Sequence, residues 1–375
     1  MIGIALLKKL NAPSREARLH NLRDAVQQAG QSLPPMDPRM INNHIHTTYS
    51  FSPYSPAAAV FAARAEGLCT CGIVDHDSIG GAEEFLAAGK IVGIPTTVGI
   101  EARVSMAGTP LANVRTNNPD QVGVSYMAMH GVPHRSIGMV QAYFQPLRER
   151  RNERNRKMVA RINALYEADG VSLDFDRDVL PLSMYADGGS VTERHLMLAL
   201  ARALIQNGKA ACDGAPGTLT AMLAEYDLVG RLKKECIPQV YIAATDECPK
   251  LDEYVAFCRE AGGVLAYAYL GDVTQSVTGD KKAQKFEDDY LDELFDLLDS
   301  HGVRAVTYMP TRNTQQQLDR LRALIERHGM FQISGEDINS PRQRFVIEKM
   351  HDPQFQNLID STWRIIRHEN GEETI

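Results

Sequence analysis

Histidine and carboxylate side chains stand at the ends of four segments whose apolar patterns predict β-strands. The first segment ends in Asn43-His44-Ile45-His46-Thr47 and the second in Asp75-His76-Asp77. The third ends in Gly99-Ile100-Glu101 and the last in Gly335-Glu336-Asp337. Alternate residues of a strand point to the same side, so the two histidines of the first segment can bind one ion together. Imidazoles with carboxylates suit Zn, Mn or Fe, and a bridging carboxylate can hold two ions close together.

Each of these strand ends also has a simpler interpretation. A single His or Asp at such a position is more often a cap or a turn former than a metal ligand. In a closed parallel barrel, however, the carboxyl ends of all strands lie on one face, so the four groups would converge. The H-x-H and D-H-D motifs at two of the four ends therefore favour a shared metal site over four unrelated turns.

The elements that would position these groups alternate along much of the chain. Residues 14–29 predict a helix that ends at Gly30, and Ser55-Pro56 begins a second helix that ends at Gly67. Strand and helix patterns alternate up to Val104 and again after Lys250. Strands that alternate with helices predict a parallel sheet or barrel.

The middle of the chain has a different pattern. Residues 147–166 predict a long Arg-rich helix, and residues 190–208 predict another. For most of the arginines we expect a solvated helix face. We divide the chain into an N-terminal helix and linker (1–37), a barrel (38–134 and 251–345), a mainly helical insertion (135–250) and a C-terminal helix with a polar tail (346–375).

Composition limits the classes of function. The 375 residues are 44% hydrophobic and 23% charged, which is ordinary for a soluble globular protein, and the net charge of −7 argues against a stable complex with nucleic acid. We expect a cytoplasmic protein without a membrane anchor, because no apolar run could cross a bilayer and the N-terminal stretch is too quickly charged for a secretory signal. The six cysteines are expected to be free thiols, with Cys69 and Cys71 in the core. The sequence leaves the oligomeric state open.

Several motifs resemble a known family. The runs HIHTTYS, A-x-x-x-G-L (Ala63–Leu68), IVDHDSIGGAEE and GIE resemble the signature of the PHP (polymerase and histidinol phosphatase) phosphoesterases. Thr192-Glu193-Arg194-His195-Leu196, GGVLAYAYL and Ser334–Asn339 resemble later motifs of the subgroup that includes nucleoside bisphosphate phosphatases. The likeness covers roughly residues 40–345. It implies a distorted seven-stranded (β/α) barrel, and metal-dependent hydrolysis of a phosphate ester on a small molecule or nucleotide.

The resemblance also implies roles for individual residues. His44, His46, Glu101 and Asp337 would surround one divalent ion (Mn, Zn or Fe). His76 and His130 would help to hold a second ion, although His134 is an alternative to His130, and His130 fits a surface loop equally well. Several ligands that are typical of the family are replaced: the corresponding positions are Phe51, Tyr267, Asn339 and a place near Arg312-Asn313.

Metal-activated water would then carry out the hydrolysis, because a bound ion lowers the pKa of water to about 7. We expect His76, Tyr267 and Asp337 to take part, with Asp75 or Asp77 orienting His76. Tyr267 could donate a hydrogen bond to the leaving oxygen or simply fill the space of the missing histidine. The groups expected to bind the phosphate of a small substrate are Arg194, His195, Arg312 and Arg342.

Two other classes of function remain open at this point. Related barrels cleave amide and ester bonds, so the fold alone does not fix the reaction. The replaced ligands also allow an inactive barrel that serves in binding or structure, and such a protein would bind metal weakly or not at all. The complete set of four residues for one ion favours an active phosphoesterase.

Overall fold

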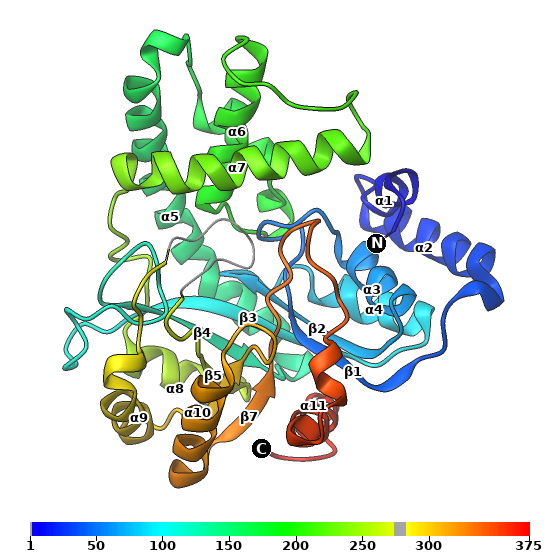
Figure 1. Cartoon of the computed structure of the whole chain (residues 1–375), viewed down its shortest axis with the longest axis vertical. Coiled ribbons are helices and arrows are strands. Elements are labelled where there is room, and N and C mark those ends of the chain that lie inside the picture. The colour runs from blue at the N-terminus through cyan, green and yellow to red at the C-terminus, as the bar shows by residue number, and fades with distance from the viewer. Residues whose placement is uncertain (1, 274–282) are drawn as a thin grey trace.

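The structure, a computed structural model, describes residues 2–273 and 283–375. Its centre is a seven-stranded sheet in which the strands are neighbours in chain order, and a parallel bridge between Ile45 and Ile338 links the first strand to the segment after the last (Figure 1). The sheet is therefore a nearly closed, distorted barrel, as the sequence predicts. Its strands are β1 (Asp37–Ile45), β2 (Leu68–His76), β3 (Thr96–Ser105), β4 (Val124–His130), β5 (Val264–Ala268), β6 (Ala305–Tyr308) and β7 (Phe331–Ser334).

Helices surround the barrel, and the predicted helix starts are confirmed. The hydroxyl oxygens of Ser14 and Ser55 accept hydrogen bonds from the backbone N–H groups of Ala17 and Ala58, which caps the helices that follow. The helices around the barrel are α1 (Ile4–Leu10), α2 (Arg15–Ala29), α3 (Pro56–Ala65), α4 (Ala82–Val92), α8 (Leu251–Ala261), α9 (Leu291–Ser300), α10 (Gln315–His328) and α11 (Gln356–Glu369).

The strand β4 departs from the expected parallel order. It is antiparallel to both of its neighbours, β3 and β5, whereas the other neighbouring pairs are parallel. The reason is the connection between β3 and β4, which spans residues 106–123 without a helix and so returns the chain at the same end of the sheet. Its last residue, His130, consequently lies opposite Val264, the first residue of β5.

The insertion between β4 and β5 is mainly helical, as expected. It contains α5 (Ile137–Leu165), α6 (Glu193–Gln206) and α7 (Leu219–Val240), and α6 and α7 lie beyond one end of the barrel (Figure 1). These helices form a hydrophobic core of their own. Phe51, from the loop after β1, is part of that core, so the loop joins the insertion to the barrel.

The C-terminal helix α11 packs at the opposite end of the barrel. The Thr362 hydroxyl accepts a hydrogen bond from Asn43 Nδ2 at 2.7 Å, and Glu369 Oε1 accepts one from the Val98 backbone N–H at 2.7 Å. All six cysteines are free thiols, and Cys69 and Cys71 are buried as predicted. Within the described ranges, every helix is too short or too polar to cross a bilayer.

Candidate metal centre

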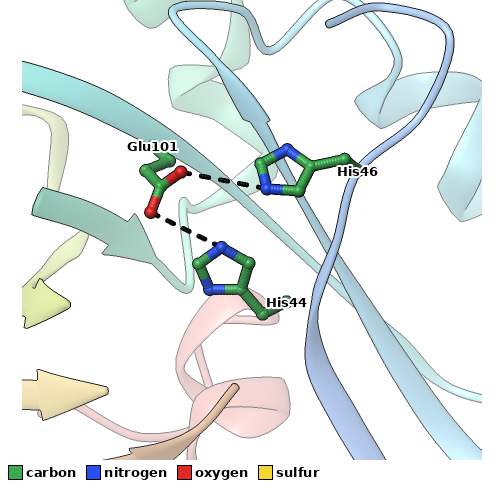
Figure 2. Close-up of side chains that lie close together, drawn as sticks. All are labelled: His44, His46 and Glu101. Atoms are coloured by element: carbon green, nitrogen blue, oxygen red, sulfur yellow. Dashed lines mark ion pairs between the residues drawn. The ribbon is translucent and has the colours of Figure 1, made fainter. Parts of the chain in front are cut away.

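Three buried side chains form the centre of the site. The carboxylate of Glu101, on β3, faces the rings of His44, on β1, and of His46, directly after β1 (Figure 2). Glu101 Oε1 is 3.5 Å from His44 Nε2, and Glu101 Oε2 is 3.8 Å from His46 Nε2. Ligand atoms that are each about 2.1 Å from a tetrahedral ion lie roughly 3.4 Å apart. The three side chains can therefore converge on one ion with small adjustments.

An irregularity in β1 makes this arrangement possible. The pairing of β1 with β2 shifts by one residue between Asn42 and Ile45. Neighbouring residues that would otherwise point to opposite faces can then both face the barrel interior. Asn43 Nδ2 donates to Ser334 Oγ, while His44 reaches Glu101. Gly335 is the other requirement, because a Cβ there would lie 3.3 Å from the His44 Cβ and 2.5 Å from Thr307 Oγ1.

His76 and Asp337 complete the group that the sequence places at the strand ends. His76 is opposite Glu101 in the β2–β3 register, and its Nδ1 is 2.9 Å from Glu101 Oε2. Asp337 Oδ1 is 3.4 Å from His46 Nε2 and accepts a hydrogen bond from Asn339 Nδ2. The structure therefore brings together all five residues.

The hydrogen bonds of Ser50 determine which nitrogen of His46 carries a proton. Ser50 Oγ donates its hydrogen to Asp75 Oδ1 at 2.6 Å and lies 3.3 Å from His46 Nδ1. Since a hydroxyl has one hydrogen, Ser50 can only accept from His46, so Nδ1 carries the proton and Nε2 carries the lone pair. This Nε2 is buried, has no hydrogen-bond partner among the described residues, and faces two carboxylates. A lone pair aimed at carboxylates is the arrangement that a cation satisfies.

The electrostatics of the centre agree with this argument. Burial alone would raise the pKa of Glu101, but the nearby His44 and His76 hold it well below its usual value, so the group is a carboxylate at neutral pH. Burial and the neighbouring His76 lower the pKa of His46 to about 3, so its imidazole is neutral. At His46 and Glu101 these are the protonation states that bind a divalent ion. Burial alone would lower the pKa of His44, but Glu101 raises it, so this ring gives up a proton when an ion takes its place beside Glu101. The residues present thus fit a metal.

Asp75 and Asp77, the aspartates on either side of His76, were expected to orient its ring, but their carboxylates have other partners. The Asp75 carboxylate accepts hydrogen bonds from the Thr47 backbone N–H and hydroxyl and from Ser50, so it orients His46 through Ser50. Asp77 instead pairs with two arginines, Arg103 and Arg151. The sequence shows the carboxylates but not the direction in which they point.

The two candidate histidines after β4 lie in different places. His130 is buried inside the barrel, with its ring centre 6.5 Å from that of His44, and its Nε2 has no hydrogen-bond partner in the described chain. Burial and the nearby His44 lower the pKa of His130 to about 3. His134 Nε2 is 3.3 Å from Glu369 on α11, at the opposite end of the barrel. His134 therefore cannot substitute for His130.

A pocket opens over the centre and is lined by cationic side chains. It encloses about 770 Å³, open mouth included, which is in the range of small-molecule sites. Its lining includes His76, Glu101 and Asp337, together with Arg194 and Lys233 from the insertion and Arg312 from the loop after β6. Arg312 Nε and Nη2 are buried and make no hydrogen bond within the described ranges. A pocket with cations around carboxylate and imidazole ligands suits a small anionic substrate that also contacts a metal.

Five of the predicted site residues lie outside the lining of this pocket: His46 and His130 are buried beside His44, and the other three make different contacts. Tyr267 faces the hydrophobic core between the barrel and its helices, because Ala268, its neighbour on β5, faces the pocket. His195 Nδ1 accepts a hydrogen bond from the Thr192 backbone N–H and helps to cap α6. Arg342 is exposed and pairs with Asp227 on α7.

The comparison with known proteins bears on the fold. No family model and no curated protein matches the sequence. Two solved structures are similar over most of their length. One is an amidohydrolase from Chromobacterium violaceum with bound sulfate and no metal, at 19% identity and a TM-score of 0.56, covering 86% of this chain and 96% of that one. The other is a candidate metal-dependent phosphoesterase from Bifidobacterium adolescentis, at 21% identity and a TM-score of 0.57. This match covers 84% of this chain and 96% of that one. The fold is shared.

Sequence reasoning missed Lys233 and Tyr126, which also line the pocket. Lys233 stands in a helical segment that has no motif around it, so nothing local distinguishes it from a surface lysine. Tyr126 lies on β4. The alternating run VSYMAMH indicates a strand there, but not that this tyrosine faces a pocket.

Proposed function

We propose that the protein is a metal-dependent hydrolase of the PHP family that cleaves a phosphate ester of a small molecule or nucleotide. The observation that carries the proposal is the buried lone pair of His46 Nε2, which faces the carboxylates of Glu101 and Asp337. The resemblance of its later sequence motifs to those of the nucleoside bisphosphate phosphatases supports a substrate of this kind. One or two ions of Mn, Zn or Fe would be the cofactor, and a small phosphorylated compound the substrate.

The side chains divide into two sets. His44, His46, Glu101 and Asp337 would hold the ion, which when bound lowers the pKa of water and polarises the phosphoryl oxygen. Arg194, Arg312 and Lys233 supply positive charge at the pocket wall, where phosphate oxygens would be neutralised.

His76 is placed between the two sets. Its Nδ1 is buried against Glu101, while the ring is partly exposed and lines the pocket. The exposed edge of the ring can hold a proton for the leaving oxygen, and Glu101 fixes the orientation of the ring.

The test of this proposal is elemental analysis of the purified protein, followed by hydrolysis assays. We expect about one Mn, Zn or Fe per chain in the wild type and in His20→Ala, an exposed histidine outside the site, and none in His46→Ala. The metal that is found is then supplied in assays on a panel of phosphate monoesters and diesters. A wild type that holds no metal and gains no activity from these ions would show that the barrel is inactive.

A second candidate is hydrolysis of an amide or carboxylic ester, because a structural neighbour is named an amidohydrolase. Both reactions would use the same metal site, so the substrate decides between them. Including amides and carboxylic esters in the panel separates the two: turnover of these compounds without turnover of any phosphate ester would support the second candidate.

A further inference from the structure

A cluster of six buried charged side chains joins the barrel to the insertion. Arg151, on α5, is its central member: Nη1 is 2.6 Å from Asp77 Oδ2, and Nη2 is 2.6 Å from Glu193 Oε2. Arg154, one turn later, pairs with the other Glu193 oxygen at 2.6 Å. We call this set the interface cluster; its members are Asp77, Arg103, Arg151, Arg154, Glu193 and Glu247.

The charges of the interface cluster balance, with three guanidinium groups against three carboxylates. Burial alone would raise the pKa of Glu193, but Arg151, Arg154 and Arg103 hold it well below its usual value. Burial would likewise raise the pKa of Asp77, and Arg103 and Arg151 lower it. Removing one member would leave a partner charge buried without compensation and would therefore destabilise the fold.

Three members of the cluster are close in sequence to residues of the candidate site. Asp77 follows His76, and Arg103 is two residues after Glu101 on the same face of β3. Glu193 precedes Arg194, which lines the pocket from the first turn of α6. The cluster therefore connects the segments that carry two residues of the metal centre to the segment that carries a pocket cation.

The backbone at Asp77 supports a positioning role. Asp77 has a φ of 50°, and it is the one non-glycine residue in the left-handed region within the described ranges. Such a conformation is unfavourable and persists where surrounding contacts impose it. Arg103 and Arg151 hold the Asp77 side chain, and Arg148 Nη1 donates to its backbone oxygen. The turn directly after His76 is thus fixed from several sides.

We propose that Arg151 and Glu193 are positioning residues that fix Arg194 of the insertion relative to His76 and Glu101 of the barrel. Arg151 is suited to this because it contacts Asp77 of the barrel and Glu193 of the insertion with the same guanidinium group. The proposal rests on the proposed function, since it assumes that Arg194 binds the phosphate of the substrate.

A double-mutant cycle tests this, with inorganic phosphate titrated into the metal-loaded full chain by calorimetry. Arg194→Ala and Arg151→Met are each expected to weaken phosphate binding, by roughly tenfold. If Arg151 acts through Arg194, the double variant is no weaker than Arg194→Ala alone. The metal content of every variant is measured in parallel, so that loss of metal is not mistaken for loss of phosphate binding.

Two further variants serve as controls. Arg18→Met breaks a buried pair with Glu84 between α2 and α4, away from the pocket, and should leave phosphate affinity unchanged. Glu193→Gln keeps the shape of the cluster and removes one charge, so it repeats the test if Arg151→Met does not fold.

The outcomes distinguish failure of the positioning role from failure of the proposed function. Losses of affinity that add up in the double variant would overturn the positioning role, as would unchanged binding in Arg151→Met, and both would leave the proposed function standing. Unchanged binding in Arg194→Ala would instead overturn the phosphate contact, and the positioning role with it. Metal loss in the wild type would mark failure of the proposed function itself.

Discussion

Replacing Ser50 by alanine would remove a contact that gives His46 its metal-binding tautomer. Ser50 accepts from His46 Nδ1 and donates to Asp75, all within the buried interior. Without Ser50, the imidazole either keeps its Nδ1 proton with no acceptor or moves the proton to Nε2. In the first case a buried donor is unsatisfied, and in the second the lone pair needed for an ion is lost.

The two outcomes have free-energy costs of similar size. A buried N–H without a partner costs about 1–3 kcal/mol. Loss of an outer hydrogen bond to a metal-binding histidine weakens metal affinity by roughly 10- to 100-fold, which corresponds to about 1.4–2.7 kcal/mol. We therefore expect the Kd for the native metal to rise by one to two powers of ten in Ser50→Ala.

The assay is a competition titration of the metal-free protein against a chromophoric chelator at fixed pH. Ser361→Ala is the matched control, because Ser361 is also a buried serine but donates to the Leu358 carbonyl on α11, away from the centre. A Kd in Ser50→Ala within twofold of the wild type, while His46→Ala loses the metal, would refute the tautomer argument.

Three further predictions follow from the same structure. Arg312→Ala should weaken phosphate binding by about 1.5–3 kcal/mol, measured by calorimetry, with metal content unchanged, because its buried guanidinium has nitrogens ready for an anion. Burial raises the pKa of Glu369 to about 7 from an ordinary 4.5, so the folded protein binds a proton more tightly than the unfolded chain. The stability that protonated Glu369 contributes is then present at low pH and falls by about 3 kcal/mol as the pH rises from 4.5 through 7. In chemical denaturation, the free energy of unfolding of Glu369→Gln should fall less over this pH range than that of the wild type. The same pH profile in both proteins would contradict this. Gly99→Ala should lower the free energy of unfolding by about 1–3 kcal/mol, because the new Cβ would lie 2.5 Å from the Met129 carbonyl oxygen. Gly138→Ala, in α5 with open space around it, should instead raise it by up to about 1 kcal/mol.

The barrel and the convergence of its strand ends could be predicted because both depend on local patterns. Alternation of apolar residues identifies strands, and parallel order places their carboxyl ends together. His44, His46, His76, Glu101 and Asp337 meet for this reason. The antiparallel β4 was not predicted, because its direction depends on a helix-free connection whose path is set by tertiary packing.

The fate of the arginines on α5 shows a limit of sequence patterns. A run of arginines on a helix usually indicates a solvated face, yet Arg148, Arg151 and Arg154 are buried. Arg151 and Arg154 pair with Glu193 and Glu247, which are 39 to 93 residues away in the chain, and nothing in the local sequence pairs them. Burial of charge depends on long-range partners, so it becomes visible when the fold is known.

Two positions of the PHP-like motifs where the typical ligand is replaced have other structural roles in this chain. Phe51 packs against His195 and Tyr226 in the insertion core, so this position directs no ligand towards the centre. Asn339 donates a hydrogen bond to Asp337, which orients that carboxylate, and Asn339 also lines the pocket. Two of the replaced positions thus anchor the insertion and orient the Asp337 carboxylate, while Arg312 supplies positive charge at the wall of the same pocket.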